Sequence, residues 1–182
     1  MAITLLLGGV RAGKSARAVS LAADASPNGR VLFVATAQAF DDEMRQRIDA
    51  HQRERPAGWV TLESPLDLPE ELSQHLATSG STYDVIIVDC LTLWVSNLIL
   101  SLPESANAET HVADRVRDLL AVLQTHEAIG VSNEVGLGIV PPTSLGRRYR
   151  DALGRANQLV ASAATDVRLL IAGIELPLKS RG

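Results

Sequence analysis

An eight-residue run, GGVRAGKS at positions 8–15, constrains the fold of this chain more than any other feature. It follows an apolar segment, Ile3–Leu7, that suits a buried strand, and it leads into an amphipathic segment, Lys14–Ala23, that suits a helix. Glycines at such a junction let backbone N–H groups point at phosphate oxygens, aided by the helix dipole. Lys14 would place a positive charge on the β- and γ-phosphates, and Ser15 a hydroxyl on Mg²⁺. The run predicts a nucleotide-binding phosphate loop; a glycine-rich turn that matches by chance is the alternative.

Short apolar runs alternate with longer amphipathic stretches along the rest of the chain, as is typical of parallel strands joined by helices. The predicted strands are Ile3–Leu7, Val31–Ala35, Trp59–Leu62, Val85–Asp89, Ile129–Ser132, Val167–Ala172 and Leu176–Lys179. The predicted helices are Lys14–Ala23, Asp41–Arg53, Leu66–Ala77, Leu91–Leu100, Thr110–Thr125 and Ser144–Ala164. Right-handed crossovers between such elements give a mostly parallel sheet. We therefore expect an α/β fold of the P-loop NTPase (RecA-like) type, with three layers, and a single nucleotide-binding domain over residues 1–182.

A phosphate loop needs an acidic residue near the metal, and Asp89 is the candidate. Four apolar residues, Val85–Val88, run into Asp89 at the predicted carboxyl end of a strand. Ligands of open α/β sheets collect at these ends. We expect Asp89 to hold Mg²⁺ together with Ser15; the alternative is that Asp89 caps the helix that follows.

His51 lies in an unusually basic helical segment. Its spacing from Met44 and Ile48 places the three residues on one helical face, so a structural role at the end of an apolar seam is one interpretation. The arginines around it support another, because they would attract anions and keep the imidazole neutral and nucleophilic. A neutral imidazole beside bound phosphates can attack phosphorus. These arginines are Arg45, Arg47, Arg53 and Arg55.

The segment 133–142, NEVGLGIVPP, has two glycines and two prolines directly after a predicted strand. This composition indicates a defined loop at the edge of the sheet where ligands bind. A rigid turn that ends the strand explains the composition equally well.

Composition narrows the functional classes. The formal net charge is −4 and no basic block or basic-aromatic stripe occurs, which argues against a nucleic-acid partner. Cys90 is the only cysteine, so neither an internal disulfide nor a cysteine-based zinc site is expected. The first residues lack a secretory pattern, and no apolar run reaches the roughly 18 residues of a membrane span. We expect a cytoplasmic protein that acts on small phosphorylated ligands.

Taken together, these segments resemble the bifunctional adenosylcobinamide kinase / adenosylcobinamide-phosphate guanylyltransferase family of cobalamin biosynthesis. The strongest match is NEVGLGIVP at 133–141, and the matches span nearly the whole chain in family order. The other matching segments are GGVRAGKS at 8–15, Ala35-Thr36, Asp41–Met44, Arg47-Ile48 with His51, Arg55-Pro56, Trp59 with Glu63, Asp89–Thr92, Asn97-Leu98, Arg147, Tyr149–Asp151, Gly154-Arg155 and Asn157-Gln158.

The resemblance implies two reactions: phosphorylation of adenosylcobinamide by GTP or ATP, and transfer of GMP from GTP to the product phosphate through a guanylylated His51. It implies catalytic roles for His51 and Lys14, and a homotrimer with nucleotide sites near the subunit interfaces. The implied nucleotide contacts are Gly8, Gly9, Val10, Arg11, Ala12, Gly13, Lys14, Ser15, Ala35, Thr36, Gln52, Arg53, Glu54, Arg55, Glu63 and Asp89.

Two positions depart from the family pattern. Ala12 replaces a more frequent serine, which should matter little because the backbone N–H is the phosphate donor. Ala50 stands where some members carry a second histidine. Three other functions stay open: a single-activity P-loop small-molecule kinase, a nucleotide-dependent switch or ATPase subunit, and nucleotide binding without catalysis. Trp94 is one candidate for stacking on the corrin ring, since aromatic residues are few.

Overall fold

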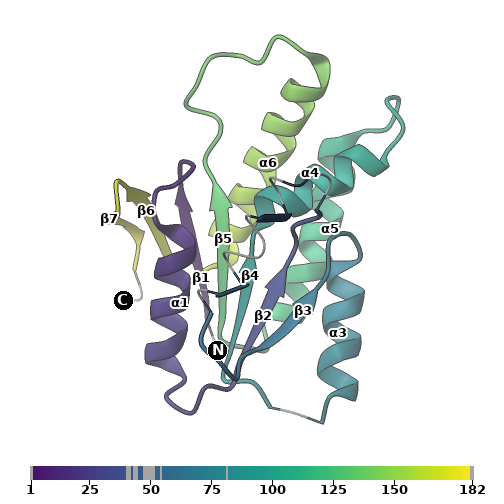
Figure 1. Ribbon diagram of the computed structural model, residues 1–182. Coiled ribbons are helices and arrows are strands. Elements are labelled where there is room, and N and C mark those ends of the chain that lie inside the picture. Colours follow the sequence, from purple (N-terminus) through teal and green to yellow (C-terminus); the bar gives the residue numbers. More distant parts are fainter. Residues whose placement is uncertain are drawn as a thin grey trace.

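The strands of the described chain form one mixed sheet in the order β3-β2-β4-β5-β1-β6-β7 (Figure 1). The computed structural model describes residues 2–39, 42, 45–46, 52–53, 55–80 and 82–180. The strands are β1 (Ile3–Gly8), β2 (Val31–Ala35), β3 (Val60–Glu63), β4 (Val85–Asp89), β5 (Ala128–Asn133), β6 (Asp166–Ile171) and β7 (Ile174–Lys179). All neighbours pair in parallel except β6 and β7, which form an antiparallel hairpin. The predicted mostly parallel sheet is confirmed.

Helices cover both faces of the sheet and give the three predicted layers (Figure 1). They are α1 (Lys14–Ala25), α3 (Leu68–Thr78), α4 (Leu91–Ser101), α5 (Ala108–Leu123) and α6 (Ser144–Ala163). Apolar side chains of α3, α4, α5 and α6 form one core cluster with residues such as Leu5 and Ile86, whereas α1 packs through Ala18 and Ala22 on the other face. The helix predicted over Asp41–Arg53 falls largely outside the described residues.

Alternation along the strands explains how both faces become apolar. In β4, Ile86 and Val88 contribute to the larger cluster, while Val85 and Ile87 contribute to the cluster under α1. A strand covered on both faces must be apolar at every position, which is why these segments read as continuous apolar runs. Across the described residues, no helix combines the length and apolar character that crossing a bilayer requires.

Trp94 belongs to the core and not to a ligand surface. It lies on α4, a helix of mostly apolar sequence, and its side chain is 0% exposed. Its indole Nε1 donates a hydrogen bond to the carbonyl of Leu66 at 2.9 Å. The prediction that Trp94 stacks on a corrin ring is therefore wrong, because its helix turns this side chain into the interior.

Candidate active site

The phosphate loop connects β1 to α1 at the carboxyl edge of the sheet. Gly13 immediately precedes α1 with φ 93°, and Arg11 also has a positive φ of 59°. Ala12 N donates to the carbonyl of Gly9 at 3.3 Å, which curls the loop. At Gly8, an added Cβ would lie 2.4 Å from the carbonyl oxygen of Leu170 on β6. A side chain is thus excluded where the loop leaves the sheet.

Lys14 is the first residue of α1 and lies under the loop. Its side chain is buried, at 7% exposed, and Nζ donates to the carbonyl of Gly9 at 2.6 Å. Burial lowers the pKa of Lys14, and the neighbouring Cys90 and Asp89 act in the opposite direction. A buried ammonium group at a helix N-terminus is suited to bind phosphate oxygens and to offset their negative charge.

Asp89 ends β4 and faces the phosphate loop. It follows Val85 and Ile87 at alternate positions, and these two residues pack in the core cluster under α1. The N-cap position of α4 is Cys90, one residue after Asp89, and the Cys90 side chain makes no capping hydrogen bond. The alternative that Asp89 caps α4 is therefore wrong, and its carboxylate lies on the same face of the sheet as the loop.

The donor set at the loop fits a hard cation such as Mg²⁺. The described residues contain no group of three or more His, Cys, Asp or Glu side chains that could hold a metal ion. Mg²⁺ typically takes one or two protein oxygens and completes its shell with water and substrate phosphates. Ser15, which is half-buried one residue after Lys14, and Asp89 would supply such a pair.

Thr36 supports this edge of the sheet from within. It is 0% exposed, and its N–H donates to the carbonyl of Asp89 at 3.2 Å. Its hydroxyl donates to the carbonyl of Cys90 at 2.7 Å and accepts from the N–H of Cys90 at 2.9 Å. Its carbonyl accepts from Nδ2 of Asn97 at 2.9 Å. These hydrogen bonds fix the Asp89–Cys90 backbone beside the phosphate loop, and the predicted contact of Thr36 with the nucleotide stays a prediction.

A pocket of about 490 Å³ lies beside β3, next to the carboxyl end of β2. The guanidinium of Arg55 lies over the ring of Phe33 at 3.8 Å and donates to Thr61 Oγ1 at 3.2 Å. Gln52 Nε2 donates to Glu63 Oε1 at 3.4 Å. Burial lowers the pKa of Arg55, while Asp89 and Glu63 act to raise it. The Nε of Arg55 is buried and has no acceptor among the described residues. The pocket thus combines a cation, a carboxylate and apolar surface.

Comparison with known proteins identifies the family to which this chain belongs. The sequence model of the family described as cobinamide kinase / cobinamide phosphate guanyltransferase matches residues 4–178. The chain belongs to this family. It is 40% identical over 185 residues to the bifunctional adenosylcobalamin biosynthesis protein CobU of Salmonella typhimurium, covering 96% of this chain and 98% of the relative. It is 43% identical over 176 residues to CobP of Pseudomonas aeruginosa, with 96% of each chain covered.

Membership of the family confirms the resemblance and its two activities. The enzyme is a bifunctional cobinamide kinase and cobinamide-phosphate guanylyltransferase of cobalamin biosynthesis. Solved structures support the fold. The flagellar accessory protein FlaH of Methanocaldococcus jannaschii superposes with a TM-score of 0.55 at 15% identity, over 98% of this chain and 78% of that chain. An ATPase domain gives a TM-score of 0.56 at 14% identity, over 99% and 77%. The RecA-like P-loop prediction is confirmed.

The family's predicted nucleotide contacts fall into two groups in the structure. One group, the loop 8–15 with Ala35, Thr36 and Asp89, lies at the carboxyl edge, where Ala35 of β2 is the register partner of Asp89 of β4 and the N–H of Thr36 donates to the carbonyl of Asp89. Gln52, Arg55 and Glu63 line the pocket beside β3, with Arg53 exposed next to them. His51 and Glu54 lie outside the described residues, so their roles stay predictions.

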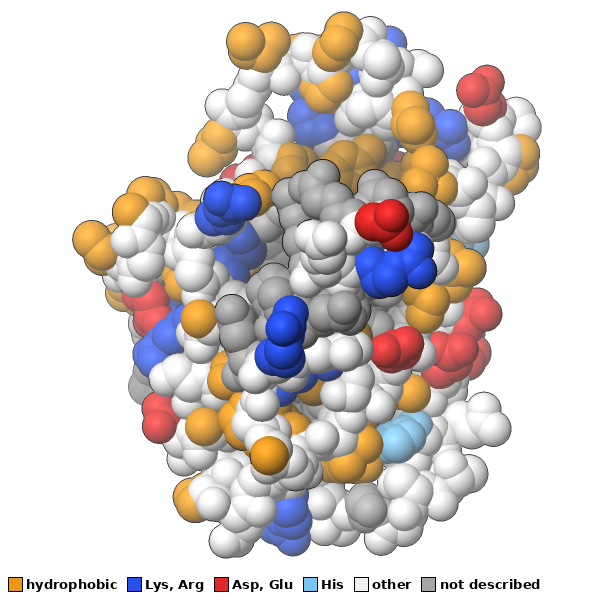
Figure 2. Space-filling view, viewed as in Figure 1, with side chains coloured by type: hydrophobic (Ala, Val, Ile, Leu, Met, Phe, Trp, Pro, Cys, Tyr) orange, Lys and Arg blue, Asp and Glu red, His pale blue; other side chains and the backbone are white. Residues whose placement is uncertain are grey.

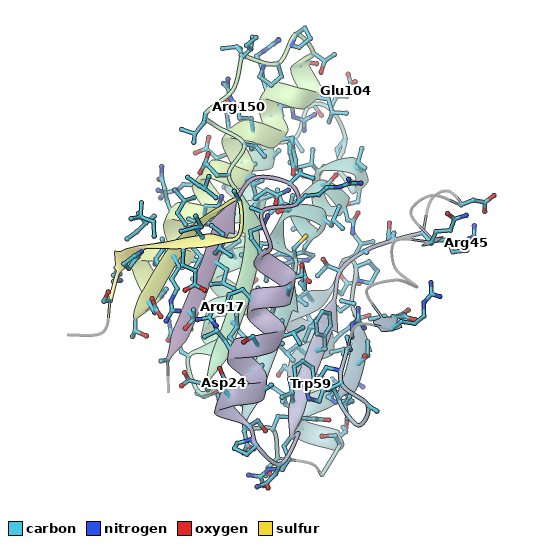
Figure 3. The ribbon with its side chains drawn as sticks, turned by 60° about the vertical axis from the view of Figure 1, so that its left-hand side comes forward. Arg17, Asp24, Arg45, Trp59, Glu104 and Arg150 are labelled. Carbon is cyan, nitrogen blue, oxygen red and sulfur yellow. The ribbon has the colours of Figure 1, made fainter. Side chains whose placement is uncertain are left out.

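The β6–β7 hairpin contacts the phosphate loop, a contact that no sequence motif predicted. Gly173 N, at the hairpin turn, donates to the carbonyl of Ala12 at 3.1 Å. Arg17 projects from α1 toward the hairpin and pairs with Glu175 of β7, which also accepts from Arg168 at 2.8 Å (Figure 3). The loop and the helix that follows it are therefore both bound to the β6–β7 hairpin, the loop through the turn and the helix through β7.

A cleft of about 610 Å³ lies beside α1, toward the amino edge of the sheet, and carries no candidate catalytic residue. It is lined in part by Thr4, Arg168 and Glu175. Burial alone would raise the pKa of Glu175, but hydrogen bonds from Arg168 and Arg17 hold it below the ordinary value. Because carboxylates already pair with these arginines, the cleft does not resemble an anion site.

The loop after β5 is ordered by its own polar groups. Gly136 N donates to Glu134 Oε1 at 2.6 Å, and Arg147 Nη1 donates to the carbonyl of Pro142 at 2.8 Å. Its apolar side chains nevertheless face solvent, with Leu137 87% and Ile139 97% exposed. Figure 2 shows hydrophobic side chains gathered at this upper tip, and again along the β6–β7 hairpin on the left. The loop is thus a defined structure with an apolar surface.

Proposed function

We propose that one nucleotide site on residues 8–15 serves both reactions of the enzyme. The observation that carries this proposal is the placement of Lys14 under the loop with the Asp89 carboxylate near it on the same face of the sheet. Residues Ser15 and Asp89 would hold Mg²⁺, which supplies positive charge to the phosphate oxygens. The remaining loop residues, Gly8–Gly13, would bind phosphate oxygens through backbone N–H groups.

In the phosphorylation step, the hydroxyl of adenosylcobinamide attacks the γ-phosphorus of GTP or ATP. Charge spreads over the γ-phosphoryl oxygens in such a transition state, so catalysis depends on positioning and electrostatic stabilisation. Lys14 is placed for this task because burial keeps its ammonium close to the loop.

In the guanylylation step, we propose that His51 attacks the α-phosphorus of GTP while pyrophosphate leaves. The GMP group then passes from the histidine to the phosphate of adenosylcobinamide phosphate. The described ends of the segment that carries His51 support this role. Residue 36 lies beside Asp89, and Arg55 lies beside Phe33 of β2, so the segment leaves and rejoins the fold next to the site.

The pocket beside β3 is proposed to receive the guanine base and ribose. Guanine presents two adjacent N–H donors, and the carboxylate of Glu63 is their natural acceptor. Arg55 and Gln52 border the same pocket, with Arg53 and Glu54 as further predicted contacts. A carboxylate at this point favours guanine over adenine, because adenine presents no matching pair of donors.

The assembly is proposed to be a homotrimer that works in the cytoplasm, where its nucleotide substrates are made. Exposed apolar side chains support association: Ile171, Ile174, Leu176 and Leu178 of the hairpin are all more than half exposed. Surfaces of this kind usually mark interaction sites. Light scattering on the purified enzyme measures the mass, and a mass of one chain would refute the trimer.

The histidine intermediate is tested with GTP labelled at the α-phosphate. Wild-type enzyme should retain acid-labile, base-stable label after denaturation, as a phosphoramidate does. His51→Ala should lose this label and guanylylation but keep much of the phosphorylation, and Lys14→Ala should lose both reactions. His111→Ala, a histidine on α5, is the matched control and should label normally. If His51→Ala still labels, or if the wild type phosphorylates cobinamide without labelling, the proposed intermediate is wrong.

A further inference from the structure

Asn133 occupies the strand end between the phosphate loop and Asp89. Strand β5 lies between β1 and β4 in the sheet. In register, Asn133 is the partner of Gly8, where the phosphate loop begins, and Val131 is the partner of Asp89. The N–H of Glu134 donates to the carbonyl of Gly8 at 3.2 Å, so the pairing continues to the first residue of the loop.

The alternation of β5 gives the side on which Asn133 lies. Ile129 and Val131 pack in the core cluster under α1, the face over which the phosphate loop folds. Ser132 points the other way, where its hydroxyl donates to Asn157 of α6 at 2.6 Å. Side chains along a strand alternate between faces, so Asn133 follows Val131 onto the nucleotide face. Asp89 reaches the same face by the same alternation along β4.

Buried polar side chains fix the backbone of Asn133 on both sides. Its N–H donates to Thr92 Oγ1 at 2.7 Å, and its carbonyl accepts from Nδ2 of Asn157 at 3.0 Å. The Oδ1 of Asn157 accepts from Ser132, which assigns the orientation of that amide. Asn157 is itself buried. Because side chains from α4 and α6 hold its backbone, Asn133 is positioned before substrate binds. Electrostatic stabilisation of a transition state depends on such preorganised groups.

We propose that Asn133 is a catalytic residue of the phosphorylation step, in which its Nδ2 donates a hydrogen bond to an oxygen of the γ-phosphoryl group. The inference rests on the proposed placement of the nucleotide on residues 8–15. A bond forms between the substrate hydroxyl oxygen and the γ-phosphorus, and the bond from the γ-phosphorus to the β,γ-bridging oxygen breaks. The nucleoside diphosphate leaves, and the hydroxyl proton passes to water. The amide carries no charge, so it can donate a hydrogen bond to the negatively charged γ-phosphoryl oxygens without repelling the substrate.

The same residue should matter less in guanylylation. There the reacting centre is the α-phosphorus, and the developing charge lies on the departing pyrophosphate near Lys14. Asn133 would touch only the terminal phosphate, whose bonding does not change in that step. Separate assays of the two reactions therefore distinguish a contact with the transferred group from general support of the site.

The test uses full-length Asn133→Asp and Asn133→Ala, with Asn28→Asp as the matched control in an exposed turn at the opposite edge of the sheet. Three quantities are measured for each protein: kcat and KM for phosphorylation of cobinamide, the rate of labelling by GTP labelled at the α-phosphate, and the affinity for β,γ-imido-GTP. Thermal unfolding checks that each variant is folded.

Loss of one preorganised donor typically lowers kcat by about 10²–10³. We expect a fall of this size in phosphorylation for Asn133→Ala, and a fall at least as large for Asn133→Asp because its carboxylate repels the phosphate. For Asn133→Ala, labelling should fall less than about tenfold and analogue affinity should change only a few-fold, whereas the repulsion in Asn133→Asp should also weaken binding of the analogue. Unchanged phosphorylation in Asn133→Ala, or equal loss of phosphorylation, labelling and affinity in that variant, overturns the inference. If the wild-type enzyme does not become labelled, the proposed histidine intermediate is refuted. The inference about Asn133 is then tested by the phosphorylation assay and the analogue affinity alone.

Discussion

Replacing Trp94 with phenylalanine tests the assignment of this side chain to the core. Phenylalanine keeps an aromatic ring in the α4 interior but lacks the indole N–H that donates to the carbonyl of Leu66 at 2.9 Å. Because Trp94 is 0% exposed, neither the hydrogen bond nor the lost ring atoms can be replaced by water without rearrangement. The cost should therefore appear in stability and not in substrate binding.

The magnitude follows from three contributions. The carbonyl of Leu66, a half-buried residue, loses its donor, which costs up to about 1–3 kcal/mol. Loss of roughly two buried ring carbons costs about 0.8 kcal/mol for each. A residual cavity of roughly 40 Å³ adds about 1 kcal/mol, at about 24 cal/mol per Å³. The free energy of unfolding should fall by about 3–6 kcal/mol for Trp94→Phe, which in a domain of this size lowers Tm by roughly 6–24 °C.

Urea and thermal unfolding followed by circular dichroism measure the change in stability. Steady-state phosphorylation, at a temperature where the variant is folded, gives KM for cobinamide, which should equal that of the wild type. A Tm change below about 3 °C combined with a several-fold rise in that KM would refute the reasoning. It would place Trp94 on the corrin-binding surface after all.

The other predictions concern the loop and its neighbouring thiol. Gly8→Ala should lower stability by about 2–5 kcal/mol and impair both reactions, because its Cβ would lie 2.4 Å from the carbonyl of Leu170. Gly9→Ala, which meets nothing within 4 Å, is the control and should stay stable under the same urea titration. Burial, reinforced by Asp89, raises the pKa of the Cys90 thiol to about 11. The folded state keeps this proton where the unfolded chain has lost it, so stability should fall as pH rises from 9.0 toward 11. Unfolding of Cys90→Ser across the same range should show a shallower fall, and an equal slope would contradict the assignment.

The sequence predicted most of the fold because its signals are local. Strands β2 and β4 have the predicted bounds, and the other described elements shift by only a few residues at their ends. Continuous apolar runs separated by amphipathic stretches leave few arrangements besides a covered parallel sheet. The phosphate loop was readable for the same reason, since the strand, glycines, lysine and serine are contiguous in the chain.

Roles that depend on distant residues could not be read in this way. Thr36 is a predicted nucleotide contact, and only the structure shows that it is also buried and hydrogen-bonded to residues 89, 90 and 97. Trp94 was a candidate for stacking on the corrin ring, but the rotation of α4 about its axis turns this side chain into the core. Asn133 stood in a motif without a role until the sheet order placed β5 between β1 and β4.

The sequence by itself thus determined that the chain is a P-loop enzyme of a recognisable family, because a phosphate loop is a local structure whose chemistry lies in its own residues. Only the tertiary structure decided which polar side chains lie on the same face of the sheet as the phosphate loop and which are buried behind it. Strand order, register and helix rotation are set by packing between segments far apart in the chain, and that packing is not encoded in any one segment.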